Sequence, residues 1–277
     1  MKYRRLKQKS VREILYTLGK RTPRYIKNSY FAFRLRKNSS QWRKLIPNEL
    51  YNTSKGSYNK KFFFTTNDKS LKSFKNHFDY KTIIENANLI LNNEMQIFSS
   101  KIEYNEGLPV WNYSIDRDTH WSQNYSDKIN YHDYKNFGDP RYTWELNRFL
   151  HFFDLGRSFF ITSNSKYCKR ICSEIDNWVS NNDFMKGINW TEGIEVSIRS
   201  INWIFAYQFI NKTSNFLKIE EKFVESLYLH GHFIKENLSD KWVTNNNHII
   251  AELAGLLFIG NFFYKFNFGK VWFNFAV

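Results

Sequence analysis

The chain has 277 residues, 42% of them hydrophobic and 19% aromatic, and this composition excludes an intrinsically disordered protein. The length allows one large domain or two small ones, with a sizeable core in either case. Only four Pro and eleven Gly are present, which favours long helices over a many-stranded β fold.

The net charge of +15 is concentrated at the N-terminus. Residues 1–45 hold fifteen Lys and Arg against one acid, Glu13, so this segment carries +14. The rest of the chain is nearly neutral, with 26 basic and 25 acidic residues. We therefore predict a basic N-terminal arm over residues 1–50 and a main domain over residues 51–277.

The arm has two interpretations. In residues 1–44, apolar residues recur at helical spacing among basic ones: Val11, Ile14, Leu15 and Leu18. Such a helix can make peripheral contact with an anionic membrane or hold an acidic polymer. It can equally dock on the main domain with its charged face in water, which is the simpler interpretation. No nucleic-acid-binding motif accompanies the charge, so nucleic acid is not expected as a partner.

The cysteines, the N-terminus and the apolar segments indicate the cellular compartment of the protein. Cys168 and Cys172 lie one helical turn apart, which indicates reduced, partly buried thiols, with neither a disulfide nor a metal site. The basic N-terminus lacks an apolar core and a cleavage site, so no signal peptide is visible and the sequence alone predicts a cytoplasmic protein. No segment offers about 20 uninterrupted apolar residues, so no transmembrane span is expected.

Helical periodicity increases along the chain. Residues 52–78 read as an irregular connection, Lys81–Ser99 as a helix, and Phe98–Tyr134 as a long aromatic loop layer. Asp139-Pro140 is an N-cap followed by Pro, and it starts a helix that runs through Leu155. Four further helices are predicted, separated by short polar breaks: Lys166–Ser180, Thr191–Asn211, Ile219–Leu238 and Asn246–Phe266. Short connections favour antiparallel pairs, as in a bundle, a solenoid or an α/α toroid, and the absence of an exact repeat argues against the solenoid.

Two predicted helices carry polar residues at helical spacing in apolar surroundings. They are Glu145, Arg148 and His151 on the first, and Glu195, Arg199 and Asn202 on the second. One interpretation is an ion pair within each helix on a wet face, worth about 0.2–0.5 kcal/mol. The other is a polar stripe that faces a shared cavity, with Trp190 at the cavity mouth to stack on a sugar.

The triplet Asn246-Asn247-His248 opens the last predicted helix. One Asn is enough to cap the helix, so the other Asn and the His are available to contact a ligand, and a helix N-terminus favours an anionic one. From spacing alone, an ordinary polar helix start is the simpler interpretation.

Three segments together resemble a known family. Residues 190–203 (WTEGIEVSIRSINW) resemble the WxxGIExxxR helix of heparinase II/III-like polysaccharide lyases, and residues 139–148 (DPRYTWELNR) are similar to their upstream WELNR segment. Residues 246–252 (NNHIIAE) match the NNHxxAE helix start shared with related alginate lyases. The order and spacing of all three agree over Ile83–Phe266, and the combination is more specific than any one motif.

The resemblance implies an all-α chain that forms an incomplete (α/α) toroid, without the antiparallel β-sheet domain that follows in the family. It implies β-elimination on a uronic-acid polysaccharide, such as a glycosaminoglycan or alginate, and hence an anionic polysaccharide as partner. No cofactor is expected in this chain, since a family metal site would lie in the β-sheet domain. Family members are often periplasmic or secreted.

The resemblance also assigns residues. Asn247 and His248 become the catalytic pair, and the substrate-binding candidates are Asn246, Trp190, Glu195, Arg199 and Arg148. The C5 proton of a uronate is hard to remove beside an ionised carboxylate, and donors to that carboxylate let charge delocalise into an enolate-like intermediate. An Asn amide donates without titrating, and a His can donate or accept the proton. Glu252, one turn later, is expected to orient the His ring.

The departures from the family are informative too. The family's general-base Tyr lies downstream of this helix, and a further His comes from the β-sheet domain, whereas this sequence stops at Val277 after an apolar run. We therefore expect a truncated fragment, inactive or weakly active. The alternatives are a non-catalytic binder of anionic glycan or membrane through its arm, and a glycoside hydrolase using Glu145, Glu195 or Glu252.

Overall fold

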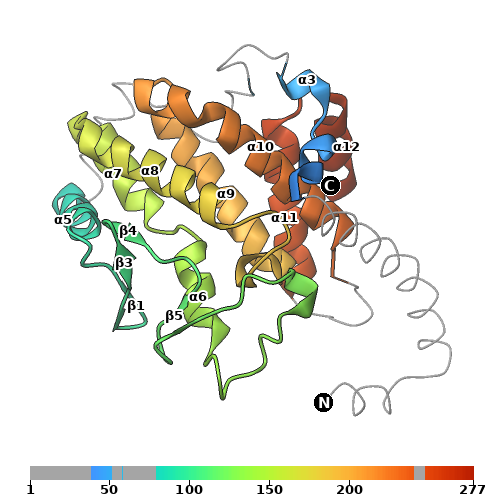
Figure 1. Cartoon of the computed structure of the whole chain (residues 1–277). Helices are drawn as coiled ribbons and strands as arrows, with labels where there is room; N and C mark the ends of the chain where they lie inside the picture. The colour runs from blue at the N-terminus through green and yellow to red at the C-terminus, as the bar shows by residue number, and fades with distance from the viewer. Residues whose placement is uncertain (1–38, 52–57, 59–78, 240–246) are drawn as a thin grey trace.

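The computed structural model describes residues 39–51, 58, 79–239 and 247–277 (Figure 1). The helix predicted within the first 18 residues and most of the connection over 52–78 lie outside this part, as does Asn246. The elements before the main helices are a 3-10 helix η1 (Ser39–Leu45), a short α3 (Asn48–Tyr51) and α5 (Tyr80–Leu91). Ile46 and Leu50 are buried in the same core as the main helices.

The remaining elements are three hairpins, two short 3-10 helices and seven α-helices. The hairpins pair β1 (Gln96–Ile97) with β2 (Ser100–Lys101), β3 (Tyr104–Asn105) with β4 (Leu108–Pro109), and β5 (Tyr113–Ser114) with β6 (Thr119–His120), all antiparallel. The helices are η2 (Ser126–Lys128), α6 (Pro140–Asn147), α7 (Phe152–Thr162), α8 (Ser165–Asn181), η3 (Ile188–Trp190), α9 (Gly193–Ile210), α10 (Ser214–Glu236), α11 (Asn247–Phe262) and α12 (Asn267–Ala276).

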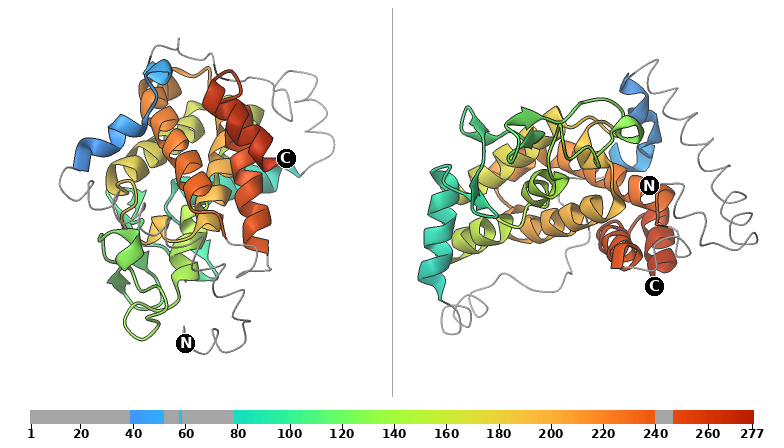
Figure 2. Two further views of the ribbon diagram at one scale, coloured as in Figure 1. Left: turned by 90° about the vertical axis from the view of Figure 1, so that its right-hand side faces the viewer. Right: turned by 90° about the horizontal axis from the view of Figure 1, so that it is seen from below.

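The helices form pairs that repeat around the molecule. In one layer, α9 packs between α7 and α11. In a second layer, α8 and α10 pack on each other. The hairpins and α5 lie at one end of the array, and α11 and α12 lie at the other (Figures 1 and 2). This arrangement confirms the predicted all-α fold and its incomplete (α/α) toroid.

Two helix starts follow local capping rules. The side chain of Asp139 accepts a hydrogen bond from the backbone N–H of Arg141, with Pro140 at the first helical position, as predicted. Thr213 caps α10 by accepting from the N–H of Phe216, with 3.3 Å between Oγ1 and N. Because of this cap, α10 begins at Ser214 rather than at the predicted Ile219.

The helix predicted to run from Asp139 through Leu155 is broken in two. Phe149 has a φ of 59° between α6 and α7, a backbone conformation that costs free energy for a bulky residue. Its ring is fully buried and packs 5.0 Å from the ring of Trp111 and 4.7 Å from that of Phe152. Burial of a large aromatic side chain offsets the backbone cost, which is a tertiary effect that helical spacing does not reveal.

The predicted helix Lys81–Ser99 also ends early, at Leu91. Asn93 follows in the left-handed region with a φ of 62°, an ordinary way for Asn to end a helix. The next residues form tight hairpins, because Phe98 and Ser99 both have positive φ, as does the pair Glu106-Gly107. The loop layer predicted over Phe98–Tyr134 is therefore partly regular.

The apolar C-terminal run is largely buried within the described fold. The chain turns after α11, and α12 packs back on it, with Gly269 against the backbone of Phe263. Phe262, Phe263 and Trp272 are buried, whereas Phe275 remains 47% exposed.

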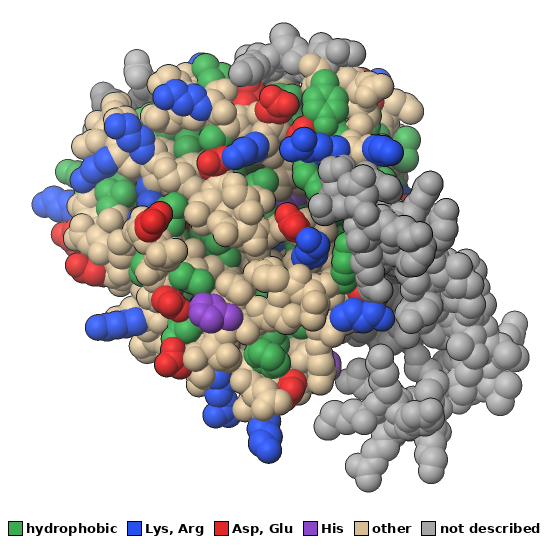
Figure 3. Space-filling view, viewed as in Figure 1, with side chains coloured by type: hydrophobic (Ala, Val, Ile, Leu, Met, Phe, Trp, Pro, Cys, Tyr) green, Lys and Arg blue, Asp and Glu red, His purple; other side chains and the backbone are tan. Residues whose placement is uncertain are grey.

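The described surface is mixed in charge. Lys and Arg side chains alternate with Asp and Glu side chains over the face seen in Figure 3. This agrees with the near neutrality of the chain after residue 45. None of the helices in the described part combines the length and the apolar character needed to cross a membrane.

The close approach of α9 and α11 gives a stability prediction. A Cβ added to Gly255 would lie 2.5 Å from Cβ and 2.8 Å from Cα of Ser197. We expect Gly255→Ala to lower the free energy of unfolding by about 1–3 kcal/mol, because the backbone of α9 has to move away. Denaturant unfolding measures this, with Ile250→Ala as control, since that side chain is 70% exposed on the same helix.

An increase in stability would contradict this packing, since Gly→Ala in an open helix stabilises by about 0.5–1 kcal/mol. The control is expected to change stability by less than about 0.5 kcal/mol.

Candidate functional site

The N-terminal ends of α9 and α11 meet. α11 makes its most extensive contacts with α9, and a Cβ on Gly193 would lie 2.6 Å from Oε1 of Glu252. Gly193 belongs to the WxxGIE segment and Glu252 to the NNHxxAE segment. The WxxGIE and NNHxxAE motifs, which lie on different helices and far apart in the sequence, are therefore in direct contact.

Glu252 is fixed in this contact. Its side chain is buried, and it accepts hydrogen bonds from Ser239, at 2.5 Å from the backbone N and 2.7 Å from Oγ. Burial raises the pKa of this carboxyl above its ordinary value, against the lowering effect of the Ser239 donors. Glu252 thus ties the end of the α10 segment to α11. The charge of His248 also acts to lower this pKa, and the orienting of the His248 ring by Glu252 stays a prediction.

Asn247 and His248 occupy the first turn of α11. Asn247 is exposed and His248 is half-buried. The Nδ1 atom of His248 lies 3.9 Å from Oε2 of Glu192, the residue directly before Gly193. The hydroxyl of Tyr131 donates to the other oxygen of Glu192, and burial together with this carboxylate raises the pKa of Tyr131.

These contacts join His248, Glu192 and Tyr131, and Asn247 directly precedes His248 on α11; we call these four residues the polar corner. Sequence reasoning missed two of its members. Glu192 lies inside the WxxG segment, so the motif could have identified it. Tyr131 lies in an aromatic stretch without a period, and no sequence pattern marks it as a site residue. The corner can donate to an anionic group through Asn247, and it can hold or pass a proton at His248.

Arg148 joins two helices. Its Nε and one terminal nitrogen bond both carboxylate oxygens of Glu195, at 2.7 and 2.8 Å, and its other terminal nitrogen bonds Glu145 at 2.5 Å. The pairing raises the pKa of Arg148, with the hydrogen bond to Glu195 as the main cause. Of the two ion pairs considered within single helices, the one between Arg148 and Glu145 is present, whereas Glu195 bonds Arg148 rather than Arg199.

Burial corrects three predicted substrate contacts. Glu195 is 4% exposed, and Trp190 is 2% exposed, with its ring packed among core aromatics rather than at a cavity mouth. Arg199 is fully buried, with its guanidinium carbon 4.3 Å from the ring centre of Trp178. A buried ring offers no face to a sugar. Arg148 keeps a quarter-exposed side chain, but its three nitrogens are already bonded to carboxylates.

Arg199 instead organises the core. Its Nε donates to Nε2 of His230 at 2.8 Å, and a terminal nitrogen donates to the carbonyl of Asn189 at 3.1 Å. Burial lowers the pKa of Arg199 to about 9. Burial and this neighbouring cation lower the pKa of His230, so that its ring accepts the hydrogen bond.

A second charged cluster lies away from the polar corner. Glu174 is completely buried and takes hydrogen bonds from Nε2 of His151 at 2.6 Å and from Nε of Arg170 at 2.5 Å. Burial acts to raise the pKa of Glu174, but the two basic partners outweigh it and the pKa is lowered. His151, predicted to share a stripe with Arg148, thus faces a different partner.

The cysteines and possible metal ligands complete the description. Cys168 and Cys172 are free and buried, with 4.0 Å between their sulfurs, as predicted for reduced thiols. In the described ranges, no three His, Cys, Asp or Glu side chains come together as a ligand set for a metal ion.

Comparisons with known proteins bear on the family and the fold of the chain. A family model described as "Heparinase II/III N-terminus" matches residues 37–277. Among solved structures, a heparinase III gene product is similar, with a TM-score of 0.53 and 17% identity over 90% of this chain. The same protein with methylated lysines gives a TM-score of 0.52 and 16% identity over 89% of this chain. At this low identity the likeness shows the helical fold alone, and this chain spans 36% of the length of each of these structures. No curated protein matches.

The raised pKa of Glu252 makes stability depend on pH. The folded chain binds this proton more readily than the unfolded chain, whose value is about 4.5, so the stabilising contribution is greatest below that pH and is lost as pH rises through the folded pKa. We expect the stability of the wild type, relative to Glu252→Gln, to fall as pH rises from about 4.5 through the raised pKa of the folded chain. Denaturant unfolding across this range measures the difference.

Glu85→Gln, at an exposed position on α5, is the control for the loss of a carboxylate. A constant or rising difference for Glu252→Gln would contradict the raised pKa.

Proposed function

Because the chain belongs to the heparinase II/III N-terminal family, we propose that it supplies the helical domain of a polysaccharide lyase. The proposed reaction is β-elimination on a uronic-acid polysaccharide. The observation that carries the proposal is the polar corner, where an exposed Asn247 and a half-buried His248 open α11 beside Glu192.

Asn247 has the properties needed to neutralise a uronate carboxylate. Its side chain is exposed in the first turn of α11, where the helix N-terminus also favours negative charge. An amide N–H that bonds the carboxylate lowers the cost of the second negative charge that develops when the C5 proton leaves. Asn247 does this at any pH, because the amide does not titrate.

His248 is proposed as the assisting group. Its ring can donate to the same carboxylate or take up a proton during the reaction. The carboxylate of Glu192, with 3.9 Å between Oε2 and Nδ1 of the ring, would pair with that ring once it is protonated. Tyr131 holds the other oxygen of Glu192, so this carboxylate keeps its position while His248 changes charge.

Complete turnover is proposed to need more than these residues. The chain covers 36% of the heparinase III structures, and the family resemblance assigns the general-base Tyr and a β-sheet domain to later segments. The substrate is therefore expected to bind between this domain and another. The basic residues 1–45 would give an anionic polymer a further contact on the same protein.

The test uses the full product of the gene that encodes these residues, read to its own stop codon. Asn247→Ala is expected to reduce the release of unsaturated uronides, followed by near-ultraviolet absorbance, by about 10²–10³-fold, as for the loss of one donor to a developing oxyanion. The 277 residues alone are expected to release little of this product.

Ile250→Ala is the matched control, because it lies on the exposed side of the same helix, 70% exposed. An unchanged rate of uronide release in Asn247→Ala would show that Asn247 does not neutralise the uronate carboxylate. Robust turnover by the 277 residues alone would contradict the need for further segments.

A further inference from the structure

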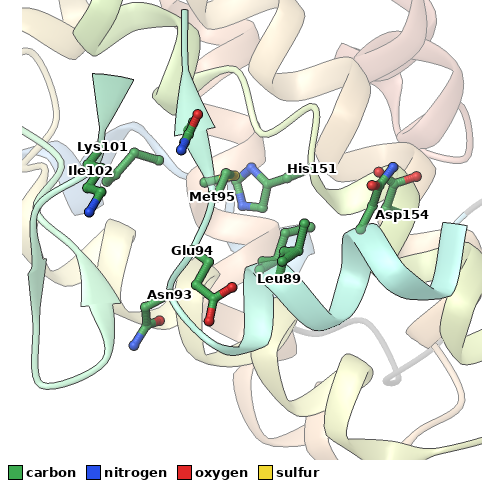
Figure 4. Close-up of a pocket in the computed structure, with 11 residues that line it drawn as sticks. Leu89, Asn93, Glu94, Met95, Lys101, Ile102, His151 and Asp154 are labelled. Carbon is green, nitrogen blue, oxygen red and sulfur yellow. The ribbon is translucent and has the colours of Figure 1, made fainter. Parts of the chain in front are cut away.

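A cavity of about 720 Å³ lies between α5, the β1–β2 hairpin and the start of α7. In Figure 4, His151 and Met95 meet at its centre, Leu89 rises toward them from α5, and Lys101 and Asp154 lie on opposite sides. None of the four residues of the polar corner lines it. The elements that form it lie at the other end of the helical array from α11 (Figures 1 and 2).

His151 gives this cavity a directed hydrogen-bonding group. The side chain is 7% exposed, and its Nε2 lies 2.6 Å from the buried carboxylate of Glu174. In the neutral form of the ring, the carboxylate partner keeps the proton on Nε2 and Nδ1 is an acceptor, and this is the form to which a ligand hydroxyl can donate. Among the described residues, Nδ1 of His151 makes no hydrogen bond, so it is available to a ligand hydroxyl.

Charges around the cavity are balanced. Arg170 is paired with Glu174 at 2.5 Å, and Arg157 is paired with Asp154 at 2.6 Å. The two further charged residues of the lining, Lys101 and Glu94, have opposite signs. The cavity therefore has no excess charge to attract an anion or a cation.

The rest of the lining is a mixture of amides and apolar groups. Asn86, Asn93 and Gln96 supply amides that can both donate and accept, and the Oδ1 of Asn93 is held by Arg170 at 3.0 Å, which leaves its N–H groups to donate. Leu89 is 46% exposed, and it forms an apolar wall with Met95. A sugar ring presents both kinds of surface, since its hydroxyls point outward at the edge while its C–H groups form an apolar face.

We propose that this cavity binds an uncharged sugar unit. Its volume is within the range of small-ligand sites, which are pockets with apolar walls and a few convergent polar groups. One hydroxyl donates to Nδ1 of His151, the amides bond further hydroxyls, and Leu89 and Met95 contact the C–H face. The inference does not rest on the proposed lyase activity, because the cavity and the polar corner share no residue.

The methionines allow a direct test. The sequence contains three, of which Met95 lines the cavity and Met185 is buried elsewhere in the core. The probes are the neutral disaccharides cellobiose, lactose and N,N′-diacetylchitobiose, with digalacturonate as the anionic comparison, and ¹³C-methyl resonances report binding. We expect a saturable shift of the Met95 methyl with at least one neutral probe and no shift of Met185.

Two exposed positions on α5 provide matched variants. Asn86→Trp puts a large ring into the cavity and is expected to weaken the binding by at least about tenfold. Glu85→Trp, one residue earlier and outside the lining, is expected to bind as the wild type does. Loss of binding in both variants alike, or in neither, would overturn the proposed site.

A third variant tests the role of His151. The amide of His151→Gln can still donate to Glu174, so the buried carboxylate keeps a partner, but the acceptor at Nδ1 is lost. We expect binding several-fold weaker, about the effect of one hydrogen bond, with the Met185 resonance unchanged as evidence of folding. Unchanged affinity would contradict the hydrogen bond through Nδ1. Absence of a Met95 shift with every neutral probe, or a shift only with digalacturonate, would overturn the proposal as a whole.

Discussion

The close contact between α9 and α11 is the constraint on which the site depends. Two glycines make it possible, because a Cβ on Gly193 would meet Glu252 and a Cβ on Gly255 would meet Ser197. With the helix starts held this close, Glu192, directly before α9, comes beside His248 in the first turn of α11. The geometry of the polar corner is therefore a consequence of helix packing: the glycines set the distance between the two helices, and this distance brings the polar groups together.

Buried charges hold the rest of the array. Arg148 bridges α6 and α9 through Glu195, Glu174 holds His151 and Arg170, and Arg199 lies against Trp178 in the core. Taking such groups from water is costly, and each is compensated by hydrogen bonds or by an aromatic face. These residues fix the positions of the helices, so most of the polar side chains predicted to face a cavity instead bond other residues of the protein. What remains available to ligands lies at the helix starts and in the cavity beside α5.

Sequence reasoning was most successful where the signal is local. Asp139-Pro140 predicted a helix start that the structure has, and the three motifs in order predicted the toroid. It failed where a distant partner decides. Phe149 breaks a helix because its ring is buried among aromatics, and Glu195 bonds Arg148 on another helix rather than Arg199 on its own. Trp190 and Arg199 were predicted to face a cavity, because periodicity does not distinguish a polar stripe in the core from one in a cleft. Tyr131 was not identifiable at all, because it comes from a stretch without a period.

The central claim is that the start of α11 holds a uronate carboxylate, and binding at the polar corner tests it most directly. The measurement is a titration of this chain with an unsulfated oligouronate, followed by the side-chain amide resonance of Asn247 and the ring resonances of His248. The account predicts saturable shifts at both residues in the wild type and in Asn86→Trp, whose substitution lies at the other end of the array. In Asn247→Ala, the shift of the His248 ring is expected to be lost. Absence of shifts at the corner, or a His248 shift that persists unchanged in Asn247→Ala, would contradict the claim.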